Sequence, residues 1–513
     1  MTAPIVIGID SSTTSTKALA FDAAGRLLSE GRSAIPMTNP QMGYFEQDPR
    51  DWWRSTVAAL QGCLDGLDAS AVKGLSISNQ RETLGVFDAD GVPVRPAILW
   101  LDERSRLDVK EFAETAGAER IHAITGRIPD TTSAAYRIHW VLKKEPDVAA
   151  RAATFADVQS YLVHCLAGGP LRTGWPSADP LGLFDLEGKT WSVPLLDAMG
   201  LEETRLPAAY PPGTLLGTVT AEAAAETGLA PGTPVYAGGG DGQLAGLGTN
   251  CTIPTRAYIN LGTAVVSGVW SPTYHYDKAW RTEIAGHGEG YILENCLRSG
   301  TFFLDWFVNQ FVDTDDGADV YARLEAEAMN LPIGSQGAMV LPYLSGVMDP
   351  HWDTDARGVM IGLSSSHKQA NVYRAILEGI TLDQVSRTGA TEKATGTAVD
   401  HFVAIGGGAA SQLWRQMLAD ASGKEVRISA TNEASALGAA MIAAAGAGLY
   451  GSIADAAAGM AGKTEAIEPN LAVASRYQDL KEIYGRLYAA TADINQRLVA
   501  FQEQDAFAGG EEV

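Results

Sequence analysis

One local arrangement of residues occurs twice in this chain, about half a chain apart. Residues 5–17 (IVIGIDSSTTSTK) form an apolar segment that ends in a hydroxyl-rich turn, and residues 18–22 have the pattern of the returning strand. Residues 257–269 (AYINLGTAVVSGV) repeat the order of strand, Gly/Thr turn and strand. Such turns present backbone N–H groups and hydroxyls, which bind phosphate oxygens. The repeat therefore predicts two related halves that grip a polyphosphate from both sides.

Length and the alternation of apolar and amphipathic segments indicate two α/β domains. A chain of 513 residues, 46% of them hydrophobic, is too long for a single core. The polar segment 249–256 contains Pro254 and reads as a hinge, because the second hairpin begins directly after it. We therefore expect an N-terminal domain over residues 1–250 and a C-terminal domain over residues 251–513.

Hydrophobic periodicity predicts further elements in both halves. The last residues, 509–513, are expected to be frayed. Strands are expected at 72–78, 84–87, 234–238 and 402–405, and helices at 52–64, 135–144, 371–387, 411–421 and 474–502.

Composition argues against several kinds of partner. The net charge of −23 disfavours nucleic acid, because binding to that polyanion depends on Lys and Arg side chains. The four cysteines are scattered without CxxC spacing, which favours free thiols in a reducing cytoplasm. Residues 434–450 are uncharged, but their apolarity comes largely from Ala and Gly, so an internal helix is favoured over a membrane span. We expect a small-molecule ligand, no nucleic acid, no membrane and a cytoplasmic location.

The first turn combines a carboxylate with several hydroxyls. Asp10 closes the predicted strand and precedes the Ser/Thr run 11–16, and Lys17 adds a positive charge. A strand-end carboxylate suits Mg²⁺, which keeps much of its water shell, while turn hydroxyls and N–H groups suit phosphate oxygens. The Walker pattern GxxxxGK[ST] does not occur at this turn. An ordinary Ser/Thr-rich turn without a ligand is the alternative.

A single carboxylate flanked by glycines forms the second candidate. Asp241 lies in the segment 238–243 (GGGDGQ), directly after a predicted strand. Glycines let the backbone turn sharply and let a substrate approach, at the strand end where open α/β sheets bind ligands. A general base needs this exposure to reach a hydroxyl. The alternative is an Asp-Gly turn without chemistry.

Two further segments suggest where the ligands bind. Arg81 and Glu82 follow another strand and together offer the donors and acceptors that a polyhydroxylated ligand requires, with a surface ion pair as the alternative. Trp100 could form an aromatic wall, although burial is the commoner fate of Trp. The glycines 406–408 lie between a strand and a helix, where a planar base can rest on the backbone. Close packing of that strand and helix explains the glycines equally well.

Together these segments resemble the FGGY family of carbohydrate kinases, and the matching stretches extend from residues 8–10 to 433–440. The most distinctive are 43–49 (GYFEQDP), 137–142 (RIHWVL), 356–358 (ARG) and 406–416 (GGGAASQLWRQ). The resemblance implies an α/β fold of two actin/hexokinase-like (ribonuclease H-like) domains. Each would have a mixed five-stranded sheet, and the two would close around a central cleft.

The resemblance also implies roles for individual residues. Asp241 corresponds to the general base, and Asp10 corresponds to the carboxylate that organises Mg²⁺. The implied reaction is in-line transfer of the γ-phosphoryl group of ATP to a primary hydroxyl, in which positioning and charge stabilisation do most of the work. Substrate contacts are expected from Arg81, Glu82, Trp100, Asp241 and Gln243, and ATP contacts from Thr13, Thr14, Ser15, Lys17, Gly262, Thr263, Gly407, Gly408 and Gln412.

The motifs give two indications about the acceptor. The segment 79–83 (NQRET) is similar to the glycerol kinase motif that holds polyol hydroxyls, but Gly242 replaces a Gln of that pattern. The segments 260–263 and 355–358 look more like xylulose kinases, which commonly have Met-His at the Arg81-Glu82 position. We expect a ketose kinase of xylulose type, with glycerol or another short polyol as the alternative. An actin-like or chaperone-like ATPase is the alternative from another class, and a homodimer is left open.

Overall fold

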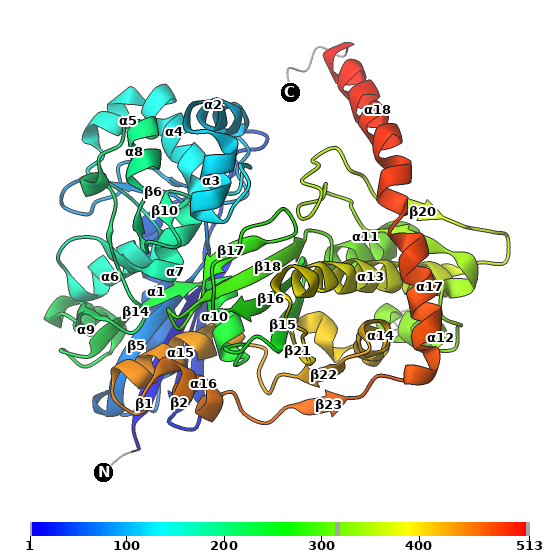
Figure 1. Cartoon of the computed structure of the whole chain (residues 1–513). Helices are drawn as coiled ribbons and strands as arrows, with labels where there is room; N and C mark the ends of the chain where they lie inside the picture. The colour runs from blue at the N-terminus through cyan, green and yellow to red at the C-terminus, as the bar shows by residue number, and fades with distance from the viewer. Residues whose placement is uncertain (1–2, 313–318, 509–513) are drawn as a thin grey trace.

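The computed structural model describes residues 3–312 and 319–508, with side chains as far as residue 502. Two lobes, each built on a mixed sheet, stand side by side (Figure 1). The first sheet has the strand order β13-β14-β5-β1-β2-β3. Its strands are β1 (Ile5–Ser11), β2 (Ser15–Asp22), β3 (Leu27–Ala34), β5 (Val72–Asn79), β13 (Leu215–Thr218) and β14 (Pro234–Gly240).

The second sheet repeats the first and has one strand more. Its order is β17-β18-β16-β15-β21-β22-β23. The strands are β15 (Arg256–Leu261), β16 (Val265–Ser271), β17 (Arg281–Ile284), β18 (Tyr291–Leu297), β21 (His401–Ile405), β22 (Glu425–Ile428) and β23 (Glu465–Ile467).

Both sheets share one core arrangement and are widened by strands at their edges. In each half the first hairpin strand pairs antiparallel with the second and parallel with a later strand, as β1 does with β2 and β5 and β15 does with β16 and β21. This leaves the same five-stranded core in both halves, β3-β2-β1-β5-β14 and β18-β16-β15-β21-β22. The two-domain α/β fold is confirmed, but the sheets have six and seven strands rather than five, because β13, β17 and β23 extend their edges.

Alternation along the strands gives each sheet two buried faces. Ile5, Ile7 and Ile9 of β1 pack into a core with α1, whereas Val6 faces α15 and α16. The helices of the first half are α1 (Pro49–Leu64), α2 (Arg106–Ala116), α3 (Ala118–Thr125), α4 (Ala134–Lys144), α5 (Pro146–Arg151), α6 (Val158–Ala167), α7 (Trp175–Ala178), α8 (Val193–Met199), α9 (Ala221–Thr227) and α10 (Asp241–Gly248).

The second half contains most of the longer helices. A large core packs α11, α13 and α14 against β15 and β16. The helices are α11 (Thr301–Phe311), α12 (Val320–Met329), α13 (Gln369–Thr395), α14 (Gln412–Ser422), α15 (Ala434–Gly446), α16 (Ile453–Met460), α17 (Ala474–Tyr484) and α18 (Leu487–Ala508). Short strand pairs complete the fold: β4 (Glu46–Gln47) with β7 (Ala97–Ile98), β6 (Gly85–Phe87) with β8 (Thr154–Ala156), β9 (Arg172–Gly174) with β12 (Ala208–Tyr210), β10 (Phe184–Asp185) with β11 (Thr190–Trp191), and β19 (Met339–Leu341) with β20 (Val359–Ile361).

Helix α15 crosses from the second half to pack on the first sheet. A Cβ on Gly8 of β1 would lie 1.8 Å from the carbonyl oxygen of Ala436, and a Cβ on Gly438 would lie 2.1 Å from that of Leu244 in α10. Only glycine allows these helices and strands to approach so closely. The segment 434–450 thus begins with a buried internal helix, as predicted, and no helix within the described residues is long and apolar enough to cross a membrane. The boundary near residue 250 stays a prediction.

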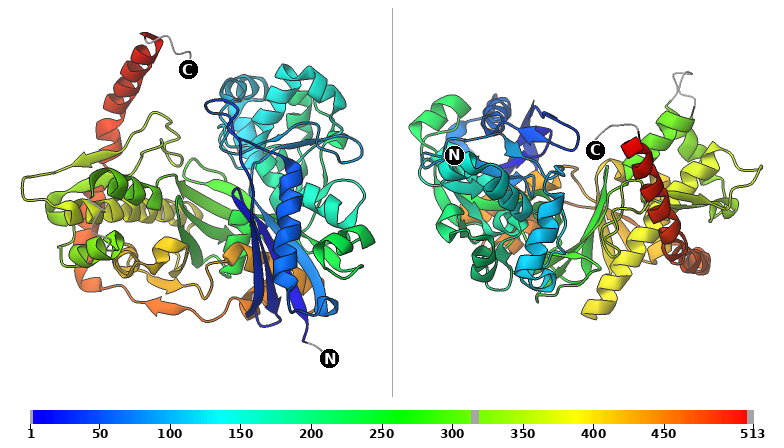
Figure 2. Two further views of the ribbon diagram at one scale, coloured as in Figure 1. Left: turned by 180° about the vertical axis from the view of Figure 1, so that it is seen from behind. Right: turned by 90° about the horizontal axis from the view of Figure 1, so that it is seen from above.

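The tail differs from its prediction. A single helix was expected over residues 474–502, but the structure has α17 and α18 separated at Gly485 and Arg486. Glycine is a weak helix former, so a break at Gly485 costs little. Helix α18 rises from the second half (Figure 2, left) and buries Asn495 and Val499 along one face. The residues expected to be frayed, 509–513, lie outside the described part of the chain.

Candidate active site

Asp10 lies beside the first hairpin turn, near the end of β1. The hydroxyl of Ser78 on the neighbouring β5 donates a hydrogen bond to its Oδ1 at 2.9 Å. Burial, together with the negative charge of Asp241, raises the pKa of Asp10 from 3.8 to about 7. Asp10 and Asp241, predicted from two separate sequence segments, are therefore electrostatic neighbours. A divalent cation would relieve this repulsion.

The first turn is fixed by neighbouring side chains. The amide of Gln47 donates to the carbonyl oxygen of Thr13 at 2.6 Å, and the indole N–H of Trp100 donates to the Thr13 hydroxyl at 2.9 Å. Thr14 is exposed, whereas Ser15 is buried. Trp100 is 40% exposed, so it lies over the turn rather than in the core. The aromatic residue predicted for the acceptor site thus contacts the predicted phosphate loop.

Lys17 is held by a residue that the sequence reasoning did not assign to the site. Its ammonium lies 2.6 Å from a carboxylate oxygen of Glu433, the residue just before α15. Glu433 also contributes to the raised pKa of Asp10. The two partners are 416 positions apart in the sequence, so no local pattern could have paired them. Lys17 lies beside the first turn, but its ammonium group already forms an ion pair with Glu433.

Asp241 occupies the first turn of α10, directly after β14. Its Oδ1 lies 3.1 Å from Nε of Arg81 and accepts a hydrogen bond from its neighbour's backbone N–H at 2.8 Å. The side chain keeps 38% of its surface exposed, which leaves room for an acceptor. Burial nevertheless raises its pKa, although the charge of Arg81 opposes the change. These are properties expected of a general base.

Gln243 lies behind Asp241 and is fully buried. Its amide nitrogen donates to the carbonyl oxygen of Pro176 at 3.0 Å and to Oδ2 of Asp179 at 3.2 Å. Its Oε1 is buried and has no hydrogen-bond partner among the residues that the structure describes. The predicted contact of Gln243 with substrate stays a prediction, and its observed contacts brace the start of α10.

Arg81 and Glu82 belong to a buried network that joins the two halves, rather than to a surface ion pair. Nη1 of Arg81 lies 2.5 Å from Glu283 on β17 and 3.1 Å from Glu294 on β18. Glu82, which has a left-handed backbone (φ 58°), lies 2.9 Å from Arg127 and 3.4 Å from Arg281. The remaining pairs are Arg127 with Asp179 (3.0 Å) and Glu283 (2.7 Å), and Arg281 with Glu294.

The carboxylates outnumber the guanidiniums in this network. Burial raises the pKa of Glu283 to about 7, even though Arg81 and Arg127 favour its charged form. Burial also acts on Glu294, but Arg81 and Arg281 outweigh it and hold the pKa of Glu294 at about 2. Glu283 therefore binds a proton at a higher pH than Glu294 does.

The second hairpin turn meets the glycine triplet. The carbonyl oxygens of Gly262 and Thr263 accept hydrogen bonds from backbone N–H groups at the start of α11. A Cβ on Gly406 would lie 2.3 Å from Oδ1 of Asn260 at the end of β15, and one on Gly408 would lie 2.8 Å from the carbonyl oxygen of Leu261. Gly406 and Gly408 therefore pack directly beside the second turn, as the close-packing alternative predicts, and the predicted ATP contacts stay a prediction.

Gly407 and Gln412 are both exposed. Gly407 opens a short 3₁₀ turn, and Gln412 is the first residue of α14, which Ser411 caps by accepting the N–H of Trp414. A Cβ on Gly407 would meet no atom of the described residues within 4 Å, so nothing in that part of the chain requires glycine there. An open glycine beside a helix N-terminus leaves room for a planar ligand.

Comparison with known proteins gives a consistent assignment. The N-terminal domain profile of the FGGY family of carbohydrate kinases matches residues 5–248, and the C-terminal domain profile matches residues 257–447. The xylulose kinase of Lactococcus lactis is 31% identical over 509 residues, covering 97% of this chain and 99% of that protein. The glycerol kinase of Symbiobacterium thermophilum is 30% identical over 88% of this chain and 91% of its own length.

A crystal structure supports the same assignment. The xylulose kinase from Rhodospirillum rubrum superimposes with a TM-score of 0.89 at 29% identity. The match covers 96% of this chain and 100% of that chain.

Proposed function

The chain belongs to the FGGY family of carbohydrate kinases, and we propose that it transfers the γ-phosphoryl group of ATP to a terminal hydroxyl of a small ketose, with xylulose as the first candidate. The xylulose kinases among its relatives support this acceptor. The observation that carries the proposal is Asp241, which is partly exposed and held by Arg81 beside Asp10.

We assign Asp241 as the general base. It accepts the proton of the terminal hydroxyl while that oxygen forms a bond to the γ-phosphorus and the bond from this phosphorus to the β–γ bridging oxygen breaks, which releases ADP. The raised pKa of Asp241 strengthens it as a proton acceptor. The charge of Arg81 fixes its orientation.

Mg²⁺ fits the carboxylate at the end of β1. Asp10 has one oxygen bonded to Ser78 and lies near a second carboxylate, and such an oxygen-rich, electron-rich position suits a hard dication. The ion would neutralise phosphate charge. The N–H groups and hydroxyls of Thr13, Thr14 and Ser15 would hold one side of the polyphosphate. Lys17, which is paired with Glu433, would turn from that carboxylate to the phosphates.

The second half would hold the rest of the nucleotide. Gly262 and Thr263 lie beside the glycine triplet, so a phosphate at the turn and a base against Gly407 and Gly408 would be contiguous. Gln412, exposed at the start of α14, could donate a hydrogen bond from its amide to the adenine base. The acceptor would lie among Asp241, Arg81, Glu82 and Trp100. Gln243 would lie behind the general base Asp241 and hold the start of α10 in place.

Release of ADP on a panel of acceptors tests the function. D-xylulose, L-xylulose, D-ribulose, glycerol, erythritol and pentitols are compared with ATP alone, and D-xylulose is expected to give the highest kcat/KM. Glycerol is the second candidate because of the NQRET segment and the glycerol kinase relative. If no compound accelerates ADP release above the ATP-only rate, the proposal is wrong.

The role of Asp241 has its own test. Asp241→Asn should bind ATP normally and lower kcat by a factor on the order of 10² to 10⁴, the range for a lost acid or base group. Glu111→Gln, which makes a comparable acid-to-amide change at an exposed position of α2, is the control and should keep the wild-type kcat. Near-normal turnover in Asp241→Asn would rule out the assigned role.

A further inference from the structure

Glu294 lies on β18 of the second sheet, yet it contacts the guanidinium that holds the proposed base of the first half. Nη1 of Arg81 lies 3.1 Å from each carboxylate oxygen of Glu294. Nε of the same guanidinium lies 3.1 Å from Oδ1 of Asp241. One planar, rigid group therefore connects Glu294 with Asp241. None of the sequence motifs assigned Glu294 to the site.

The two glycines beside Asp241 make room for this contact. A Cβ on Gly240 would lie 2.5 Å from Cγ of Arg81, and a Cβ on Gly242 would lie 2.7 Å from Oε2 of Glu294. Both separations are shorter than van der Waals contact, so a larger residue at either position would push the pair away. Glycines on both sides of the proposed base thus serve the pair of Arg81 and Glu294, in addition to the approach of a substrate.

The carboxylate of Glu294 is itself held by groups from two other strands of the second sheet. The hydroxyl of Tyr258 on β15 donates to its Oε2 at 3.0 Å, and Nη2 of Arg281 on β17 is paired with its Oε1. The side chain is fully buried, which opposes its charge, but Arg81, Arg281 and Tyr258 outweigh burial and hold its pKa at about 2. Glu294 is therefore a negative charge at a fixed position.

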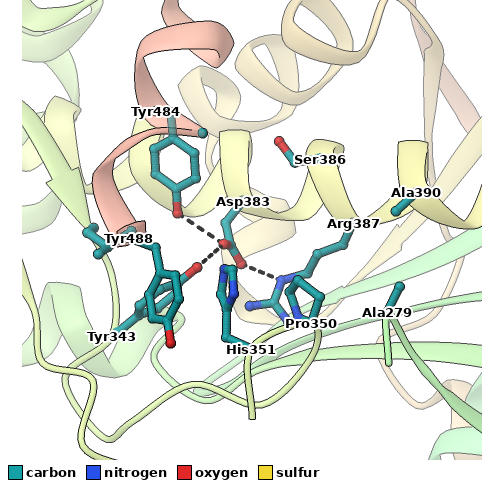
Figure 3. A pocket seen from close by; sticks show the side chains of 12 residues that line it. Ala279, Tyr343, Pro350, His351, Asp383, Ser386, Arg387, Ala390, Tyr484 and Tyr488 are labelled. Atoms are coloured by element: carbon teal, nitrogen blue, oxygen red, sulfur yellow. Dashed lines mark hydrogen bonds and ion pairs between the residues drawn. The ribbon is translucent and has the colours of Figure 1, made fainter. Parts of the chain in front are cut away.

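Helix α13 fixes the end of strand β18. Cys296 lies two positions further along β18 than the buried glutamate, and its carbonyl oxygen accepts a hydrogen bond from Nη1 of Arg387 at 3.2 Å. Asp383, one turn earlier on α13, pairs with Nε of this arginine at 2.5 Å. Its carboxylate also accepts the hydroxyls of Tyr343 at 2.8 Å and Tyr484 at 3.0 Å (Figure 3). These contacts restrain Arg387, and with it the strand that carries the glutamate.

A second carboxylate contacts the same nitrogen of Arg81. Glu283 on β17 lies 2.5 Å from Nη1, and burial raises its pKa to about 7. As the pH falls, Glu283 becomes neutral before Glu294 does, because the pKa of Glu294 is lower. Glu294 is thus the partner of Arg81 whose charge stays constant.

From these contacts we propose that Glu294 is a positioning residue, which acts through Arg81 to hold Asp241 in the orientation that accepts the proton of the acceptor hydroxyl. The proposal rests on the function proposed above, because it takes Asp241 as the general base. Without the charge of Glu294, Arg81 would turn more freely and would no longer fix Oδ1 of Asp241. A displacement of about 1 Å at a reacting group can lower a rate about 10²-fold.

The test measures kcat and the KM for ATP in full-length variants, with the acceptor that the wild type phosphorylates fastest. Glu294→Gln removes the charge and keeps the shape of the side chain. It should lower kcat about tenfold, while the KM for ATP stays within about twofold of wild type. Glu378→Gln is the matched control, because Glu378 is a buried glutamate on α13 that lies 2.9 Å from Arg374, and this variant should keep the wild-type kcat.

A variant of Arg81 shows whether the effect passes through its guanidinium. Arg81→Lys replaces the planar group by a single ammonium, which cannot hold two carboxylates in one fixed geometry. In this background Glu294→Gln should change kcat by less than about twofold, because the connection is already lost. If Glu294→Gln folds poorly, Tyr258→Phe takes its place. It removes one hydrogen bond to Glu294 and should lower kcat about threefold.

The possible outcomes separate this role from the kinase function. A wild-type kcat in the folded variant, an equal loss in Glu378→Gln, or the same fold loss with and without Arg81 would overturn the positioning role alone. If the wild type phosphorylates no acceptor, the kinase function is refuted and the positioning role with it.

Discussion

Replacing Glu283 with glutamine should change how the stability of this protein depends on pH. Glu283 is fully buried on β17, and its pKa rises from 4.5 in a free side chain to about 7 because burial outweighs the attraction of Arg81 and Arg127. Between these two pH values the folded protein retains a proton that the unfolded chain has released. The wild-type free energy of unfolding therefore falls as pH rises through this window.

The magnitude follows from the two pKa values. At 1.36 kcal/mol per pKa unit, a rise from 4.5 to about 7 corresponds to a stability loss on the order of 3 kcal/mol, most of it between pH 5 and pH 8. Glutamine carries no charge at any pH and resembles the protonated side chain. The free energy of unfolding of Glu283→Gln, measured relative to wild type, should therefore increase by about 2–3 kcal/mol over this range.

Urea denaturation followed by tryptophan fluorescence, in buffers from pH 5 to pH 8, measures this difference. Glu111→Gln is the control, because Glu111 is exposed and its pKa is lowered by the hydrogen bond from Lys143. A lowered pKa gives stability that is lost only as pH falls below about 4.5, so the difference between this control and wild type should stay nearly constant from pH 5 to pH 8. A difference between Glu283→Gln and wild type that stays constant from pH 5 to pH 8 would refute the assignment of a proton to Glu283.

Three further variants test packing and the first turn. Gly8→Ala would place a Cβ 1.8 Å from a carbonyl oxygen of α15, so we expect a loss of at least about 2 kcal/mol in urea denaturation, and wild-type stability would show that the helix shifts freely. Trp100→Phe removes a hydrogen bond to Thr13 worth about 1 kcal/mol and should raise the KM for ATP about fivefold, whereas an unchanged KM would show that this hydrogen bond does not support ATP binding at the first turn. Glu433→Gln should lower the KM for ATP by up to about fivefold, because Lys17 no longer has to leave a carboxylate, and a rise in KM would mean that Glu433 itself serves bound ATP.

The fold was predictable where its signals are local. Each hairpin combines two apolar strands with a polar turn of a few residues, so both are visible in short windows of sequence, and both have the expected strands. Edge strands such as β13 and β23 are short and only partly buried, and they show little alternation. This is why the strand counts exceed the expected five. The break at Gly485 was missed because the hydrophobic period continues on both sides of it.

The residues of the candidate site were likewise predictable only where their signals are local. Asp10 and Asp241 were recognisable because each follows an apolar strand and stands next to small or hydroxyl-bearing residues. The partners of Arg81 were not, because Glu283 and Glu294 are more than two hundred positions away and lie within ordinary-looking strands. Charged residues alternate with other residues on β17, which resembles a solvent-facing edge in sequence, and Glu294 is the single charged residue of β18. Only the packing of the two sheets shows that these carboxylates are buried.

The guanidinium of Arg81 contacts residues of both halves of the protein. Nε of Arg81 holds Asp241 at the start of α10, while Nη1 holds Glu283 and Glu294 on the second sheet. Because the guanidinium is planar and rigid, the two sets of contacts have a fixed geometry relative to each other. Any movement of the second sheet against the first must therefore either carry the partner of Asp241 with it or break one of these pairs. The position of the proposed base is thus set by the arrangement of both halves and cannot be a property of the first half alone.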